Sequence, residues 1–264
     1  METHAQELHK APGQGWKHYF YEFFMLFLAV SLGFLVENLR ERRVENEREI
    51  QYMTTMVEDL KSDTAQLSRL IAVRKNRILE LDTLFELISS DQYINNAKKV
   101  YGLFEWPHWD ILRFFPSDRT MQQLKNSGNL RLIRQRDVSD ALISYDVFVR
   151  NRKEYEPIQV DIANQMDQFI EQLIDPVILF NYKNANIKEQ LTHDTLFNNN
   201  RPINKLPEGL VIKAMNANTK KIILKYIGQF VMLYAELRKD NIKIQSRAIA
   251  ALDLIQRKYH LESE

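Results

Sequence analysis

The sequence predicts an all-α protein in which an N-terminal transmembrane helix continues into a bundle, or coiled-coil-like domain, of long helices. Three observations carry this prediction: one long apolar run, extended seams of apolar residues at helical spacing, and a scarcity of helix-breaking residues. The 264 residues include seven Gly and seven Pro, about 5% together where about 12% is average. Neither type occurs between Gly33 and Gly102, so one very long helix can form there.

The apolar run covers residues 19–36, "YFYEFFMLFLAVSLGFLV", with Glu22 as its single charge. As a helix it is about 27 Å long, which nearly matches a hydrocarbon core of about 30 Å. A charged helix follows instead of a small-residue cleavage site, so a cleaved signal peptide is disfavoured. The alternative is a buried core helix, but runs of this length with hydrophilic flanks favour a span. We therefore assign residues 1–18 to a short tail and 19–36 to a transmembrane helix.

Two features of the span bear on its orientation and contacts. The density of arginines after the span is higher than that of lysines before it. This asymmetry would place the C-terminal part in the cytoplasm, although long domains translocate largely regardless of such charge. An acid within a span, here Glu22, is a functional-site hypothesis by default; alternatively its carboxylate reaches the nearby headgroups. Ala29 and Gly33 form a small pair that permits close helix approach.

A first seam continues beyond the span in alternating steps of three and four residues. Its twelve positions are Ile50, Met53, Val57, Leu60, Thr64, Leu67, Ile71, Arg74, Ile78, Leu81, Phe85 and Ile88, and all except Thr64 and Arg74 are apolar. Such a seam must be buried, either by the chain's own helices or by a second copy. The candidate packing or oligomer face comprises Glu22, Ala29, Gly33, Met53, Val57, Leu60 and Leu67.

The remaining chain predicts two more long helices and two connectors. A second seam, from Ile223 to Ile255 with Asn241 as its polar member, lies in a helix over 218–260. Another helix spans 137–175, with Asp137 as its N-cap and an interruption at Pro157. With the first helix at 37–89, these form a bundle domain over 37–264. The connectors are 90–136, in which Gly128 ends a short helix in the left-handed conformation, and 181–209.

Recognisable catalytic chemistry is missing from the sequence. There is no cysteine, no glycine-rich phosphate loop, no paired histidine motif and no nucleophile elbow. A net charge of +1 gives no electrostatic reason to bind nucleic acid. The sequence thus predicts no enzyme activity, no metal, no cofactor and no nucleic-acid partner.

One short stretch could form a ligand site. Trp106, His108, Trp109 and Asp110 lie in "WPHWD" and could make an aromatic platform or half a metal site. The simpler interpretation is that the two tryptophans pack a loop onto the bundle, since large aromatics dominate packing energetics.

Two segments carry a family resemblance. "EFFMLFLAVSLGFLVENLRERRVENEREIQYMTTMVEDLKSDTAQL" holds an early Glu in the span, then "EN-x-RE" and "LxxDLxxD" with Asp59, Leu60 and Asp63. The second segment is "PSDRTMQQLKNSGNLRLIRQRDVSDALISYD". Together they resemble an uncharacterised family of single-span, membrane-anchored helical proteins of bacteria, over roughly residues 17–150. The resemblance implies a helical domain that faces outward from the inner membrane and implies no chemistry.

Two functions fit these observations. The first is a membrane-anchored scaffold or protein–protein interaction protein of the cell envelope, whose partners are the lipid bilayer and a second copy or another envelope protein. The alternative is a ligand-sensing extracytoplasmic module with residues 102–116 lining a pocket, which would signal through a partner protein. In both, we expect a single pass through the bacterial inner membrane with the C-terminal domain in the periplasm.

Overall fold

The prediction of an all-α fold is confirmed. The structure, a computed structural model, describes residues 16–104, 113–152, 154–175, 177–178, 180–181 and 210–261. Within these ranges every regular element is a helix. In chain order they are α1 (Trp16–Ser89), α2 (Ala97–Phe104), α4 (Arg119–Asn126), the short 3₁₀ helix η1 (Asn129–Leu132), α5 (Arg136–Arg150), α6 (Glu156–Leu173) and α8 (Ala217–Tyr259).

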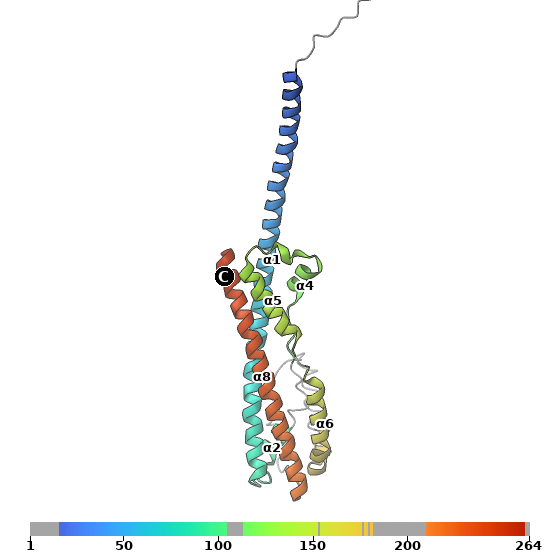
Figure 1. The fold of residues 1–264 in the computed structure, drawn as a ribbon. Helices are drawn as coiled ribbons and strands as arrows, with labels where there is room; N and C mark the ends of the chain where they lie inside the picture. The colour runs from blue at the N-terminus through green and yellow to red at the C-terminus, as the bar shows by residue number, and fades with distance from the viewer. Residues whose placement is uncertain are drawn as a thin grey trace, which may run out of the picture.

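α1 is one unbroken helix of 74 residues, about 110 Å long. Its N-terminal part stands clear of the bundle (Figure 1), and the first buried side chain is Glu49. We call residues 16–48 the stem. The stem contains an apolar stretch long enough to cross a membrane, none of which is buried inside the structure. The span and the first bundle helix are therefore a single rod.

α8 runs antiparallel to α1 along the bundle, and this pair makes the most extensive helix–helix contact (Figure 1). α5 and α6 both pack against α8, at successive levels along it (Figure 1). The predicted helix over 137–175 is thus two helices, and Pro157 occupies the first turn of the second. Proline is favoured there because the first N–H groups of a helix lack partners within it.

The ends of the short helices follow from local sequence. Gly128 adopts the left-handed conformation, with φ of 67°, directly after the C-cap Ser127 of α4. The predicted N-cap at Asp137 is wrong: Gln135 occupies the cap of α5, and Asp137 lies in its first turn. Asp137 instead forms an ion pair with Lys258 of α8 at 3.0 Å, which lowers its pKa.

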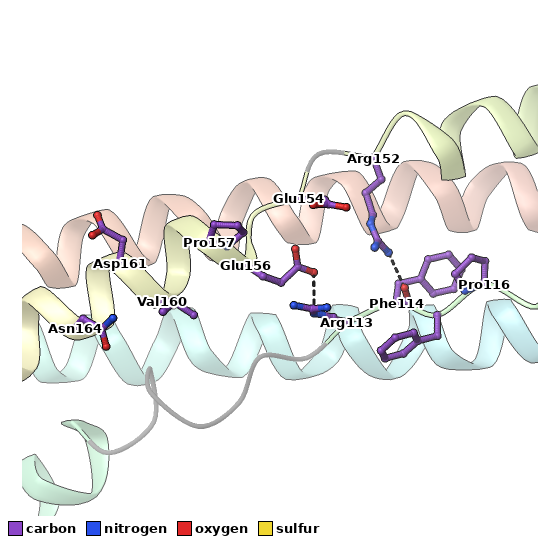
Figure 2. Close-up of a pocket in the computed structure, with 11 residues that line it drawn as sticks. Arg113, Phe114, Pro116, Arg152, Glu154, Glu156, Pro157, Val160, Asp161 and Asn164 are labelled. Carbon is purple, nitrogen blue, oxygen red and sulfur yellow. Dashed lines mark hydrogen bonds and ion pairs between the residues drawn. The ribbon is translucent and has the colours of Figure 1, made fainter.

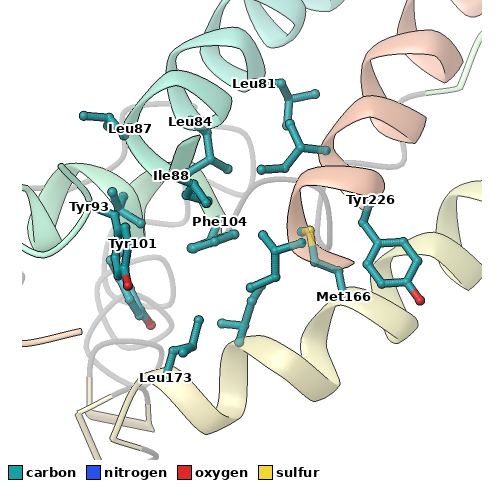
Figure 3. Close-up of a cluster of buried hydrophobic side chains, with 14 of the residues drawn as sticks. Leu81, Leu84, Leu87, Ile88, Tyr93, Tyr101, Phe104, Met166, Leu173 and Tyr226 are labelled. Carbon is teal, nitrogen blue, oxygen red and sulfur yellow. The ribbon is translucent and has the colours of Figure 1, made fainter. Parts of the chain in front are cut away.

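Two hydrophobic cores stack along the α1–α8 pair. The stem-side core joins α1 from Met53 to Leu70 with α8 from Ile244 to Ile255, together with α4 and α5. The distal core joins the end of α1 with the first half of α8, together with α2, α6 and the segment at 210–212 (Figure 3). Apolar burial of this kind contributes about 25 cal/mol per Å².

A buried polar layer separates the two cores. It comprises Arg74 and Arg77 of α1, Gln159 of α6 and Asn241 of α8. The amide of Gln159 donates to the hydroxyl of Tyr234 at 3.3 Å. The layer lies where both seams pass from one core to the other, so the polar seam positions Arg74 and Asn241 mark a boundary within the bundle.

Candidate functional site

The predicted ligand stretch, Trp106, His108, Trp109 and Asp110, lies outside the described residues. The structure resumes at Arg113. Residues 113–116 form one wall of a pocket of about 660 Å³, and the junction between α5 and α6 forms the other (Figure 2). Its lining residues are Arg113, Phe114, Phe115, Pro116, Arg152, Glu154, Glu156, Pro157, Val160, Asp161 and Asn164.

Ionic and aromatic contacts hold this pocket together. Arg152 donates from Nη1 to the carbonyl oxygen of Phe114 at 2.7 Å, and its guanidinium lies 5.8 Å from the centre of the Phe114 ring. Nε of Arg113 lies 3.4 Å from Oε1 of Glu156. Phe114 is buried, whereas 66% of Phe115 is exposed. One phenylalanine thus fixes the wall, and the other remains exposed beside the pocket.

Arg74 brings a further charge to this region from α1. Only 5% of the residue is exposed, and burial lowers its pKa to about 10, so the guanidinium stays charged at neutral pH. The charges of Arg152 and Glu156 both act on it. The pocket and the polar layer are therefore electrostatically connected.

The pocket is lined by charges of both signs. Its lining offers two arginines, three carboxylates and an exposed aromatic ring. The lining contains no histidine, serine or threonine that could pair as base and nucleophile. Within the described ranges, no cluster of three or more His, Cys, Asp or Glu side chains could hold a metal ion.

The most organised polar contacts are made by three buried carboxylates of α1, which we call the acidic clamp: Glu49, Asp59 and Asp63. Asp59 Oδ2 accepts from the backbone N of Thr120 at 3.1 Å and from its hydroxyl at 2.5 Å. Asp118, the N-cap residue of α4, makes no side-chain cap bond. A carboxylate from α1 therefore satisfies the first turn of α4.

Asp63 joins two elements to α1. Its Oδ1 accepts from the backbone N of Ser117 at 2.7 Å, and its Oδ2 accepts from the hydroxyl of Tyr145 in α5. Burial raises the pKa of Asp63, and the bonds from Tyr145 and Ser117 oppose that rise. Burial, together with the charge of Asp63, raises the pKa of Tyr145. The Tyr145 hydroxyl therefore keeps its proton and donates a hydrogen bond to Asp63.

Glu49 acts where the stem enters the bundle. One of its oxygens accepts from the backbone N of Arg134 at 2.7 Å and from the hydroxyl of Tyr259 near the end of α8. The Arg134 side chain adds an ion pair at 3.7 Å and donates to the carbonyl oxygen of Arg42 at 3.2 Å. One carboxylate thus ties the base of the stem to both the connector and α8.

The candidate packing face divides into two groups. Met53, Val57, Leu60 and Leu67 are buried in the stem-side core, so the chain's own helices cover this part of the seam. Of the two coverings that the sequence leaves open, the structure shows the chain's own helices at these four positions. Glu22, Ala29 and Gly33 lie on the stem and are exposed. A side chain added at Gly33 would meet nothing within 4 Å.

Sequence reasoning missed the acidic clamp, although a signal was present. Asp59 and Asp63 are four residues apart and therefore share a helix face, next to the seam residues Leu60 and Leu67. Asp59 and Asp63 contributed only to the family resemblance, and no contact was predicted for them. The clamp also joins the two segments that carry the family resemblance, because Asp59 and Asp63 belong to the first and their partners to the second.

Comparison with known proteins adds no relative: no protein-family model, curated protein or solved structure matches this chain.

Proposed function

We propose that this chain is a membrane-anchored helical scaffold or protein–protein interaction protein of the cell envelope, without catalytic activity. The observation that carries the proposal is the continuity of α1, whose exposed apolar stem and buried bundle half are one helix. Exposed apolar surface of this extent needs a lipid or protein environment. A bundle at the other end of the same rod would be presented at a fixed height above that environment.

The acidic clamp supports a presenting role. Glu49, Asp59 and Asp63 connect the rod to the connector, to α5 and to the end of α8. Hydrogen bonds to charged groups are stronger than neutral ones, so the bundle is held firmly on its stem. We further propose that the span crosses the bacterial inner membrane once, with the bundle in the periplasm. The family resemblance motivates that side, and the arginines after the span argue against it.

Topology fusions test the membrane assignment. Alkaline phosphatase fused after Glu264 should be active in cells, and a fluorescent protein fused there should be dark. The opposite pair of results would place the bundle in the cytoplasm. Recovery of the chain in the soluble fraction after cell lysis would reject the anchor altogether.

Site-specific photo-crosslinking tests the interaction role. A photoreactive residue at Met232 or Ile249, which are 67% and 44% exposed on α8, should capture a discrete partner in intact cells. The matched control is Ile244, which lies on the same helix and is buried. Adducts that form equally from all three positions, or from none over a scan of the exposed bundle surface, would contradict a scaffold.

The second candidate function is ligand sensing, and the pocket at residues 113–116 favours it. Its exposed Phe115 and opposed charges suit a small molecule with an apolar part and ionic groups. A metabolite panel should then contain compounds that raise the melting temperature of the full chain in detergent. Phe115→Ala should abolish that shift, whereas Phe85→Ala, at a residue 41% exposed that does not line the pocket, should preserve it. A panel without any such compound would leave the scaffold as the better proposal.

A further inference from the structure

A second cleft, of about 750 Å³, opens between α1 and the α4–η1 segment. α1 contributes residues 48–55 to it, where the stem meets the bundle, and the facing wall is formed by residues 122–129. Asp59 fixes α4 to α1 nearby, and Asn129 donates to the hydroxyl of Tyr52 across the cleft at 3.0 Å. The two walls are therefore held apart at a set separation.

The lining of this cleft is almost entirely polar and neutral. Charged residues make up 27% of the chain, yet Arg48 is the single charge among the nine residues that line the cleft. The other eight are Gln, Asn, Ser, Thr or Tyr. It contains neither a carboxylate nor an aliphatic side chain. A lining of neutral donors and acceptors selects for a ligand that is polar and uncharged.

Several of these groups have hydrogen-bonding capacity to spare. The side chains of Gln51, Gln123 and Asn126 are exposed and make no hydrogen bond to the described part of the chain. Each amide offers two donors and an acceptor with two lone pairs. They lie on two helices whose positions are already fixed. A ligand that bridges them would therefore cost little conformational freedom of the protein on binding.

We propose that this cleft binds a neutral oligosaccharide, a polyhydroxylated chain of the cell envelope. A sugar hydroxyl both donates and accepts, as an amide does, so a row of amides can pair with successive hydroxyls. A peptide would also pair with amides, but its recognition depends on pockets for its side chains. An anionic ligand would need paired arginines, and the cleft holds one.

The distance of the cleft from the apolar run favours a glycan over a lipid headgroup as its ligand. Arg48 follows Val36, the end of the apolar run, by twelve residues, about 18 Å of helix. The headgroup layer extends only about 5–8 Å beyond the hydrocarbon core. This geometry uses the membrane anchor of the proposed function, but the binding test below does not depend on it.

The test uses the full chain in a polyoxyethylene detergent, since sugar-based detergents would occupy the cleft. Maltotetraose and chitotetraose are titrated by calorimetry beside tetragalacturonate, as the anionic probe, and tetra-alanine, as the peptide probe. At least one neutral tetrasaccharide should bind. Gln51→Leu and Gln123→Leu should each weaken that binding about tenfold, because each leaves ligand hydroxyls unpaired.

Gln168→Leu is the matched control, because Gln168 is exposed on α6 and should leave affinity unchanged. Circular dichroism of each variant should match the wild type, since all three glutamines are exposed. Failure of both neutral tetrasaccharides to bind at millimolar concentration would overturn the proposal. Tighter binding of tetragalacturonate or tetra-alanine would overturn it too, as would an equal loss of affinity in Gln168→Leu.

Discussion

Tyr145 of α5 donates its hydroxyl hydrogen bond to Asp63 of α1, although the two residues are 82 positions apart in the sequence. The same carboxylate accepts from the backbone of Ser117, so one buried side chain of α1 positions both the connector and α5. Buried acceptors of this kind are costly to remove, since the donors that remain lose their only pairing. This makes Asp63 the most informative single position in the clamp.

Asp63→Ala should lower the free energy of unfolding by about 1–3 kcal/mol, because it leaves a half-buried N–H and a buried hydroxyl without their acceptor. Asp63→Asn should cost less, since an amide can accept from Ser117 while donating to the tyrosine oxygen. Denaturant unfolding followed by circular dichroism measures both variants. Equal losses for Ala and Asn would show that the charge, rather than the hydrogen bonds, holds the connector.

The pH dependence of stability tests the same residue. Burial raises the pKa of Asp63 above its usual value of 3.8, so the folded chain binds this proton more tightly than the unfolded chain does. The resulting stabilisation is complete below about pH 4 and is lost as the pH rises through the folded pKa. Asp63→Asn should therefore lose less stability than the wild type between pH 4 and pH 7. An identical pH profile in the two proteins would contradict the raised pKa.

Asp59→Ala should release the first turn of α4 from α1. The cost should resemble that of losing an N-cap, about 1–2 kcal/mol, and hydrogen exchange should rise in residues 117–122. Glu58→Ala is the control, because Glu58 is exposed and only pairs with Arg119 at 3.6 Å. Equal exchange in the two variants would show that α4 does not depend on the clamp.

Two positions of the α1 seam should differ in how much stability they lose on substitution by alanine. Leu67 is fully buried, and Leu67→Ala should cost about 2–5 kcal/mol. Ile50 belongs to the same sequence seam but is 42% exposed, and Ile50→Ala should change stability by less than about 0.5 kcal/mol. Thermal unfolding compares them. A loss of crosslinked dimers without unfolding in Leu67→Asp would restore the idea that a second copy covers this face.

Periodicity was sufficient to predict the long helices, because a seam repeated over many turns must be buried. It placed α1 as one helix from span to bundle, and it placed the buried face of α8 from Ile223 to Ile255. Ile50 and Phe85 fit the seam but are exposed. A straight helix drifts about 20° per heptad from a strict seven-residue repeat, so the buried face of α1 does not follow one seam over its full length.

The site was less predictable than the fold. The contacts of Asp59 and Asp63 were not predicted, because their partners, Ser117, Thr120 and Tyr145, lie more than fifty residues away in the sequence. The pocket at residues 113–116 and the cleft where the stem meets the bundle arise from the packing of separate helices. No local sequence pattern encodes that packing. The predicted Trp106–Asp110 site lies outside the described residues, so it remains a prediction.

Arg74 offers a last prediction, because its effect on stability and its effect on the pocket can be measured separately. It is buried between two apolar cores and the charge of Glu156 acts on it, and removal of one partner from a buried charge pair costs about 3–5 kcal/mol. Arg74→Met should therefore lower the melting temperature, and Arg69→Met, at an exposed position of the same helix, should leave it unchanged.

If the polar layer exists to support the pocket, Arg74→Met should also weaken any ligand found for the pocket. The charge of Arg74 acts on Arg152 and Glu156, and both line the pocket. Removal of that charge shifts the balance between the pocket's arginines and carboxylates. A variant with lowered stability and unchanged ligand affinity would assign Arg74 to bundle packing alone. A variant with unchanged or raised stability would contradict the cost predicted for loss of the buried guanidinium.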